Sequence, residues 1–384
     1  MPLNIESYID QTKREKIVKT IQEQSLFADK EFEILSTIRY DPNLFKGNTK
    51  FDKILSSNDT SLSKIDELFL FDENVDLVDI ITDDLSLKKK ENHENDQYID
   101  MTKANEQELM EIFYHRFFLL GEHLKRLQFT MDYFNLGEYE VDLKSLMDIL
   151  LRAIPLQEHN ENEAFDEDEE DDEITLAEIM TKLYAKKTCY KLRLLVNKKG
   201  DIRCEAYTIN TKTTTNHNYV MNNLFSGFLD DAPTHKVYLY DTKISPSCFT
   251  SFKTTYRDHY TKAREQMAKL HEGQAGPAEI LLFNTAGELM EGSITNCYAK
   301  FHFEDKWFYT TPALSTGCLC GVMRNMLVNK GIVTEMKKID VSQLMDGDEI
   351  LLSNGIMGIF KGQIVKPDNF KFKSLDDEIS NVIA

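Results

Sequence analysis

The chain has 384 residues, of which 41% are hydrophobic and 10% aromatic, as in an ordinary folded protein that can bury a sizeable core. Its 65 acidic residues outnumber its 45 lysines and arginines and give a formal charge of -20. A negative field of this size repels nucleic-acid phosphates and anionic membranes, so neither is an expected partner. The length exceeds what one core usually organises, and two domains are expected, 1–232 and 233–384, with a linker at 230–233.

The six cysteines indicate a reducing compartment, because none forms a CxxC pair and a chain of this length needs no disulfide scaffold. Cys318 and Cys320 could ligate a metal, but no histidine or second cysteine pair lies at ligand spacing, so no metal is expected. The first residues lack the apolar core of a signal peptide, and no apolar run reaches membrane-spanning length. We therefore expect a soluble, cytoplasmic protein.

Two polar segments are expected to be insertions in the first domain, at about 43–110 and 156–175. The first contains a lysine-rich and asparagine-rich stretch at 87–97. The second carries eleven acidic residues and no lysine or arginine between positions 158 and 173, and such self-repulsion is typical of a solvated loop. The alternative is that this acidic run docks a basic partner.

Helices and hairpins follow in chain order. Apolar residues recur at helical spacing over 124–134, with Gly137 as the expected stop. Strand-like segments at 190–196 and 202–209 flank a turn sequence and predict a hairpin. A second amphipathic helix places one apolar face on Tyr256, Tyr260, Ala263, Met267 and Leu270. A second hairpin is predicted at 280–283 and 288–290, and a further helix at 322–329.

Three segments after residue 248 carry the types of residue that pyridoxal phosphate (PLP) requires. Lys253 precedes a predicted helix and can form an imine with an aldehyde. Glu291 begins the sequence EGSITN at 291–296, in which Gly292 permits a tight bend and a close approach of the backbone to a flat ring. The glycine-containing sequence at 316–324 leads into a helix, whose free N-terminal amides can bind a phosphate.

In this order and spacing the segments resemble the fold type IV PLP enzymes, which include branched-chain and D-amino-acid aminotransferases and 4-amino-4-deoxychorismate lyases. The family pattern is a lysine, an E-G-[ST]-x-x-N segment and a G-[IV]-x-R helix start, and here the first two lie 38 residues apart. The sequence EHLKRL at 122–127 is similar to the family's E-H-x-x-R-L helix. The resemblance implies a two-domain α+β or α/β fold of the D-amino-acid aminotransferase type, with PLP at the domain interface.

The resemblance also implies roles for individual residues. Lys253 would hold the cofactor as an imine and act as the catalytic base, and Glu291 would keep the ring nitrogen protonated. Arg126 would bind the cofactor phosphate, and Tyr256 would contact the phenolic oxygen or simply pack. The remaining implied cofactor-binding residues are Asn296, Gly321, Val322, Met323 and Gly355. Cationic side chains should hold the two substrate carboxylates, and the candidates are Arg257, on the same face as Lys253 if that segment is helical, Arg39 and Arg193.

Within the family, residues 32–42, 249–259 and 352–358 are most similar to the fungal type of 4-amino-4-deoxychorismate lyase. This similarity implies elimination of pyruvate from aminodeoxychorismate, a small-molecule substrate, to give 4-aminobenzoate for folate biosynthesis. A branched-chain or D-amino-acid aminotransferase is the alternative, because it uses the same lysine, glutamate and arginine. A non-catalytic acidic adaptor on the same fold is a more distant one. The family implies a homodimer, although the insertions leave a monomer open.

Overall fold

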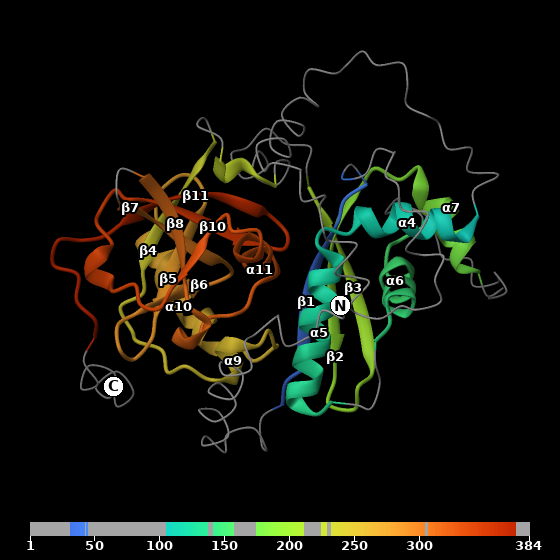
Figure 1. Cartoon of the computed structure of the whole chain (residues 1–384), viewed down its shortest axis with the longest axis horizontal. Helices are drawn as coiled ribbons and strands as arrows, with labels where there is room; N and C mark the ends of the chain where they lie inside the picture. The colour runs from blue at the N-terminus through green and yellow to red at the C-terminus, as the bar shows by residue number, and fades with distance from the viewer. Residues whose placement is uncertain are drawn as a thin grey trace, which may run out of the picture. The chain divides into compact units, whose positions relative to one another are not determined.

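A computed structural model describes residues 31–42, 44, 105–136, 141–156, 174–210, 224–228, 232–303 and 306–373 (Figure 1). Four features discussed above lie outside these ranges, namely the polar stretch 87–97, the acidic run 158–173, Gly137 and residues 230–231. The described residues divide into two compact units, one within 36–209 and one that combines 31–35 with the residues from 210 onward. The expected division near residue 232 falls inside the second unit.

In its described residues, the first unit combines a three-stranded sheet with four helices. Its strands are β1 (Ile34–Tyr40), β2 (Cys189–Val196) and β3 (Ile202–Ile209), in the order β1-β2-β3. Strands β2 and β3 form the predicted antiparallel hairpin, which turns through Gly200 at φ 87°. The helices are α4 (Glu106–Arg116), α5 (Leu120–Phe134), α6 (Leu143–Arg152) and α7 (Leu176–Tyr184).

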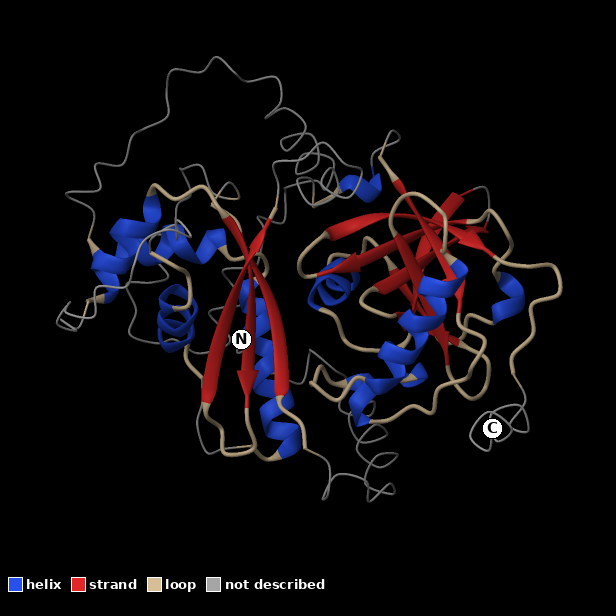
Figure 2. Ribbon diagram, turned by 180° about the vertical axis from the view of Figure 1, so that it is seen from behind, coloured by secondary structure: helices blue, strands red, loops and turns tan. Residues whose placement is uncertain are grey.

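Helix α5 lies along the three-stranded sheet (Figure 2) and confirms the helix predicted over 124–134. Its apolar face buries Leu124, Leu127 and Met131. The helix ends at Asn135, which adopts the left-handed conformation at φ 53° and donates its amide to the last turn. Asparagine tolerates this conformation better than most residues, so the helix stops there, before the expected Gly137.

The second unit is built on an eight-stranded mixed sheet in the order β6-β5-β4-β11-β10-β7-β8-β9. The strands are β4 (Thr234–Leu239), β5 (Ala278–Phe283), β6 (Leu289–Gly292), β7 (Asn296–Phe303), β8 (Lys306–Pro312), β9 (Thr334–Met336), β10 (Glu349–Asn354) and β11 (Gly358–Val365). Strand β4 runs parallel to β5 and β11, and β8 to β9, whereas the other neighbours are antiparallel. The β5–β6 pair is the second predicted hairpin.

Three helices of this unit are α9 (Cys248–Ser251), α10 (Asp258–Leu270) and α11 (Val322–Asn329). Helix α10 packs against β5 and α11 against β10. The predicted face of α10 is partly wrong, because Tyr256 precedes the helix and Leu270 is 42% exposed, so burial is concentrated at Tyr260 and Ala263. Within the described ranges, none of the helices combines the length and the apolar character that crossing a bilayer requires.

Candidate active site

Lys253 lies in a short extended segment between α9 and α10. Its carbonyl accepts a hydrogen bond from the Leu35 amide at 2.9 Å, and the next residue, Thr254, forms an antiparallel bridge with Ile34. The Thr255 amide donates to the Glu33 carbonyl at 2.9 Å. This pairing fixes the backbone on both sides of the lysine, whose side chain is half-buried. The predicted position of Lys253 before a helix is confirmed.

Glu291 lies near the end of β6 and is only 3% exposed. The Tyr260 hydroxyl donates to its Oε1 at 2.5 Å, and the Leu319 amide donates to its Oε2 at 3.2 Å. Burial raises the pKa of the Glu291 carboxyl to about 7, while these two hydrogen bonds and the charges of Arg257 and Lys253 lower it. Lys253 therefore lies close enough to Glu291 for its charge to act on this carboxyl.

The bend after Glu291 is organised by a second buried carboxylate, Glu279, which is 2% exposed at the start of β5. Its oxygens accept hydrogen bonds from the amide and hydroxyl of Ser293 and from the Thr295 hydroxyl. A Cβ on Gly292 would lie 2.2 Å from the Thr295 Oγ1 and 3.0 Å from the Glu279 carboxyl carbon. Gly292 therefore leaves the space that Thr295 and Glu279 occupy, while the predicted close approach of its backbone to a flat ring stays a prediction.

The backbone of one residue, Leu319, connects the carboxylate to the glycine-containing loop. Leu319 donates its amide to Glu291, and its carbonyl accepts a hydrogen bond from the Asn296 Nδ2 at 2.8 Å. A Cβ on Gly321 would lie only 1.9 Å from the Asn296 Oδ1. Asn296 therefore determines the path of this loop, and Gly321 leaves the space that the loop needs.

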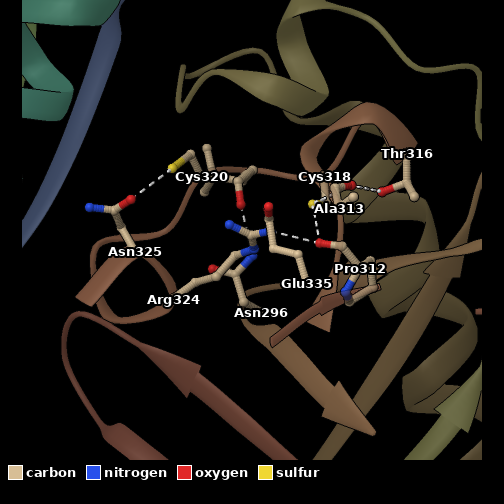
Figure 3. A network of polar contacts seen from close by, with 10 residues as sticks. Asn296, Pro312, Ala313, Thr316, Cys318, Cys320, Arg324, Asn325 and Glu335 are labelled. Carbon is tan, nitrogen blue, oxygen red and sulfur yellow. Dashed lines mark hydrogen bonds and ion pairs between the residues drawn. The ribbon is translucent and has the colours of Figure 1, made fainter. Parts of the chain in front are cut away.

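Helix α11 begins directly after Gly321 without a side-chain cap, so its first amides have no partner inside the helix. Figure 3 shows how this helix is anchored: the Arg324 guanidinium donates to the Pro312 carbonyl at 2.7 Å and to the Glu335 carboxylate at 2.6 Å. Arg324 is 2% exposed. The arginine of the predicted G-[IV]-x-R sequence thus holds the helix in place, and the amides of Val322 and Met323 stay available for an anion.

Gly355 lies in the turn between β10 and β11. The Asn354 side chain shapes this turn by accepting hydrogen bonds from the amides of Ile356 at 2.9 Å and Met357 at 2.8 Å. The strand register pairs Ser353 of β10 with Asn296 of β7. This register brings the Gly355 turn to the same end of the sheet as Asn296, which holds the Gly321 loop.

The two other predicted residues near the lysine differ in their surroundings. Tyr256 packs its ring against Phe249, with centroids 4.5 Å apart. Arg257 does not share a helical face with Lys253, because the segment between them is not helical and Arg257 is itself the N-cap of α10. Its guanidinium donates to the Ser293 carbonyl at 3.1 Å and lies 4.5 Å from the centroid of the Tyr260 ring.

Arg126 is buried in the first unit on α5. Its Nη2 lies 3.3 Å from the Ser36 hydroxyl and 3.4 Å from the His123 Nδ1, and these two atoms are 2.8 Å apart. Arg39 is 1% exposed and forms an ion pair with Asp41. The roles predicted for these two arginines stay predictions.

Arg193, the third candidate for the substrate carboxylates, lies on β2 of the first unit. It pairs with Glu205 on the neighbouring strand at 3.0 Å, and about a third of each side chain is exposed. Such an exposed pair contributes little stability. Its role toward a substrate also stays a prediction.

The residues of the second unit fit PLP, which carries an aldehyde, a pyridine nitrogen and a phosphate. Lys253 supplies a primary amine for the aldehyde, and Glu291 a buried acceptor for the ring nitrogen. The uncapped start of α11, directly after Gly321, offers amides for the phosphate. Among the described residues no group of three or more histidines, cysteines and carboxylates could hold a metal ion. These residues fit PLP, and their individual roles toward it stay predictions.

Comparisons with known proteins identify the family of the chain. Residues 107–363 match the family model for amino-transferase class IV. The chain is 32% identical over 381 residues to the aminodeoxychorismate lyase of Saccharomyces cerevisiae, which covers 90% of this chain and 96% of that protein. It is 28% identical over 178 residues to a candidate aminodeoxychorismate lyase of Schizosaccharomyces pombe, covering 46% of this chain and 67% of that one.

Among solved structures, a candidate amino-acid aminotransferase from Mesorhizobium loti aligns with a TM-score of 0.49 at 18% identity, over 87% of this chain and 100% of that chain. The chain belongs to the class IV aminotransferase family, as its family-model match and its yeast relative establish. PLP is the cofactor of this family, so the fold and the cofactor expected from the sequence are confirmed.

Replacing Gly321 with alanine is expected to weaken PLP binding by about tenfold or more, because overpacking of a fixed site costs on the order of 1–3 kcal/mol. The new Cβ would clash with the Asn296 Oδ1, and Asn296 cannot easily withdraw while it holds Leu319. Absorbance titration of the apoprotein with PLP measures the effect. Ser315→Ala, an exposed change six residues before Gly321, is the control. Equal PLP affinity in Gly321→Ala and wild type would contradict the account.

Proposed function

We propose that this chain is a PLP-dependent 4-amino-4-deoxychorismate lyase, which releases pyruvate and leaves 4-aminobenzoate, a precursor of folate. The observation that carries the proposal is the similarity to the yeast lyase along almost the whole length of both chains. The family includes aminotransferases, which use the same anchors, so the class of site alone does not select the reaction. The similarity to the yeast lyase over almost its whole length favours the lyase reaction.

The chemistry divides between the cofactor and the protein. When bound, PLP supplies an electron sink for the carbon that bears the substrate nitrogen. Lys253 would hold the cofactor through its side-chain amine, and this amine, when free, would remove the proton from this carbon. The bond from the ring to the enolpyruvyl oxygen then breaks, and the departing enolpyruvate takes up a proton to become pyruvate. Loss of the proton and of this group leaves an aromatic ring.

The other residues hold the reacting groups. Glu291 is held by hydrogen bonds from Tyr260 and Leu319, and its carboxylate would stabilise positive charge on the ring nitrogen of bound PLP. The start of α11 and Arg126 would hold the phosphate. For the substrate carboxylates the favoured cation is Arg257, because its guanidinium lies on Ser293 and Tyr260, next to Glu291.

The reaction is tested by incubating the PLP-loaded protein with aminodeoxychorismate in the absence of any 2-oxo acid. We expect stoichiometric pyruvate, measured with lactate dehydrogenase and NADH, together with 4-aminobenzoate measured by its fluorescence. Product formation that depends strictly on an added 2-oxo acid would instead identify an aminotransferase. A colourless protein that gains no visible absorbance from added PLP would favour the adaptor hypothesis.

We also propose a cytoplasmic location and a homodimer. All six cysteines, which lie among the described residues, are free thiols, and this supports a reducing compartment. The dimer rests on the family alone. Analytical ultracentrifugation of the full chain would decide between dimer and monomer.

A further inference from the structure

The hydrogen bond between Tyr260 and Glu291 joins two side chains that are almost fully buried, at 6% and 3% exposure. Tyr260 lies in the first turn of α10, and its hydroxyl reaches the Glu291 Oε1 at 2.5 Å. Since the Leu319 amide donates to the other oxygen, each carboxylate oxygen receives one donor from the protein. An ionised carboxylate accepts about four hydrogen bonds, so Glu291 is oriented and retains acceptor capacity.

The Tyr260 ring is itself held in place. The Arg257 guanidinium lies 4.5 Å from the ring centroid and is tied to the Ser293 carbonyl at 3.1 Å. A second arginine of the same helix, Arg264, donates to the Ser293 hydroxyl at 3.2 Å. The phenol is thus enclosed between α10 and the 291–296 bend, and its hydroxyl has a defined direction.

Burial and the neighbouring charges have opposite effects on the pKa of the Glu291 carboxyl. Burial favours the neutral acid and raises the pKa of this carboxyl to about 7, so its charge at physiological pH depends on nearby donors. Glu291 interacts electrostatically with titratable and charged side chains from several elements. They are Tyr260, Arg257, Lys253, Cys297 and Cys318. Among these side chains the Tyr260 hydroxyl donates a hydrogen bond directly to the carboxylate.

We propose that Tyr260 is a positioning residue that keeps Glu291 an oriented carboxylate, so that the ring nitrogen of bound PLP meets a charged acceptor and not a neutral acid. The proposal rests on the proposed function only in that Glu291 faces the cofactor ring. Helix α10 then has a second role besides packing on β5. Tyr260, seven positions after Lys253, acts through Glu291 on the ring nitrogen of the cofactor.

Tyr260→Phe tests this proposal, because it removes the hydroxyl and keeps the ring beneath Arg257. We expect PLP affinity, measured by absorbance titration of the full-length apoprotein, to fall roughly tenfold at pH 7, since hydrogen bonds to charged groups contribute about that much. At pH 9 the affinity should approach that of wild type, because Glu291 then ionises without the donor. The control is Tyr238→Phe, which removes another tyrosine hydroxyl of this unit, 3.1 Å from His271.

Four results separate the possibilities. Equal affinity of Tyr260→Phe and wild type at every pH, or an equal loss at pH 7 and pH 9, would overturn the positioning role while leaving the proposed function intact. Wild-type protein that binds no PLP would instead overturn the function. If Tyr260→Phe does not fold, the double variant with Glu291→Gln should fold, because it removes the buried charge, and failure of both variants to fold would refute the proposal.

Discussion

Lys253→Ala is expected to abolish both the yellow chromophore and product formation, with a loss of activity of at least about a thousandfold. The substitution removes the amine that links to PLP and that serves as the base. The fold should persist, because the backbone at this position is held by pairing with residues 33–35 and not by the lysine side chain. Absorbance spectra and the pyruvate assay measure the effect, and circular dichroism verifies the fold.

Lys262→Ala provides a matched control, since this lysine is exposed on α10 and lies nine residues from Lys253. We expect it to retain the chromophore and full activity. A Lys253→Ala protein that still releases pyruvate at near the wild-type rate would show that another group performs the chemistry.

Glu291→Gln is expected to reduce lyase activity by at least about a hundredfold, because the electrostatic stabilisation of the ring nitrogen is lost. Glutamine keeps the shape and can still interact with Tyr260 and the Leu319 amide, so the loss reports the charge. The steady-state rate of pyruvate release measures it. Unchanged activity in this variant would remove Glu291 from the mechanism.

The same variant has a distinct effect on stability in the absence of PLP. The folded pKa of Glu291, about 7, lies above its ordinary value of 4.5, so the stability linked to this group is present below pH 4.5 and lost as the pH rises to 7. The loss is on the order of 3 kcal/mol. Relative to wild type, Glu291→Gln should therefore gain unfolding free energy between pH 5 and pH 8, as urea denaturation can measure. Parallel pH profiles would contradict a buried, proton-binding Glu291.

Sequence patterns predicted the elements whose signals are local. The two hairpins around residues 197–201 and 284–287 were predicted from turn residues between strand-like segments. Helix α5 was predicted from apolar periodicity, and α11 from the glycine-containing segment that precedes it. Lys253, Glu291 and the Gly321 loop were found because their order along the chain resembles a known family. The structure adds the contacts that bring the last two together through Leu319.

Other parts of the site could not be predicted because they arise from tertiary packing. Tyr260 matched an apolar helix face, and nothing local indicates that its hydroxyl meets Glu291. In the sequence, Glu279 directly precedes the strongly apolar residues 280–283. Its position next to this apolar run was a signal from which its burial could have been predicted. The ion pair between Arg39 and Asp41, two residues further along, is another contact that the sequence pattern did not indicate.

The central claim is that Lys253 carries the cofactor, and peptide mapping tests it most directly. The PLP-loaded protein is reduced with borohydride, digested with a protease, and the modified peptide is sequenced by mass spectrometry. The account predicts one stoichiometric pyridoxyl phosphate adduct, located on Lys253. An adduct on a different lysine, or none in a protein that releases pyruvate, would contradict it.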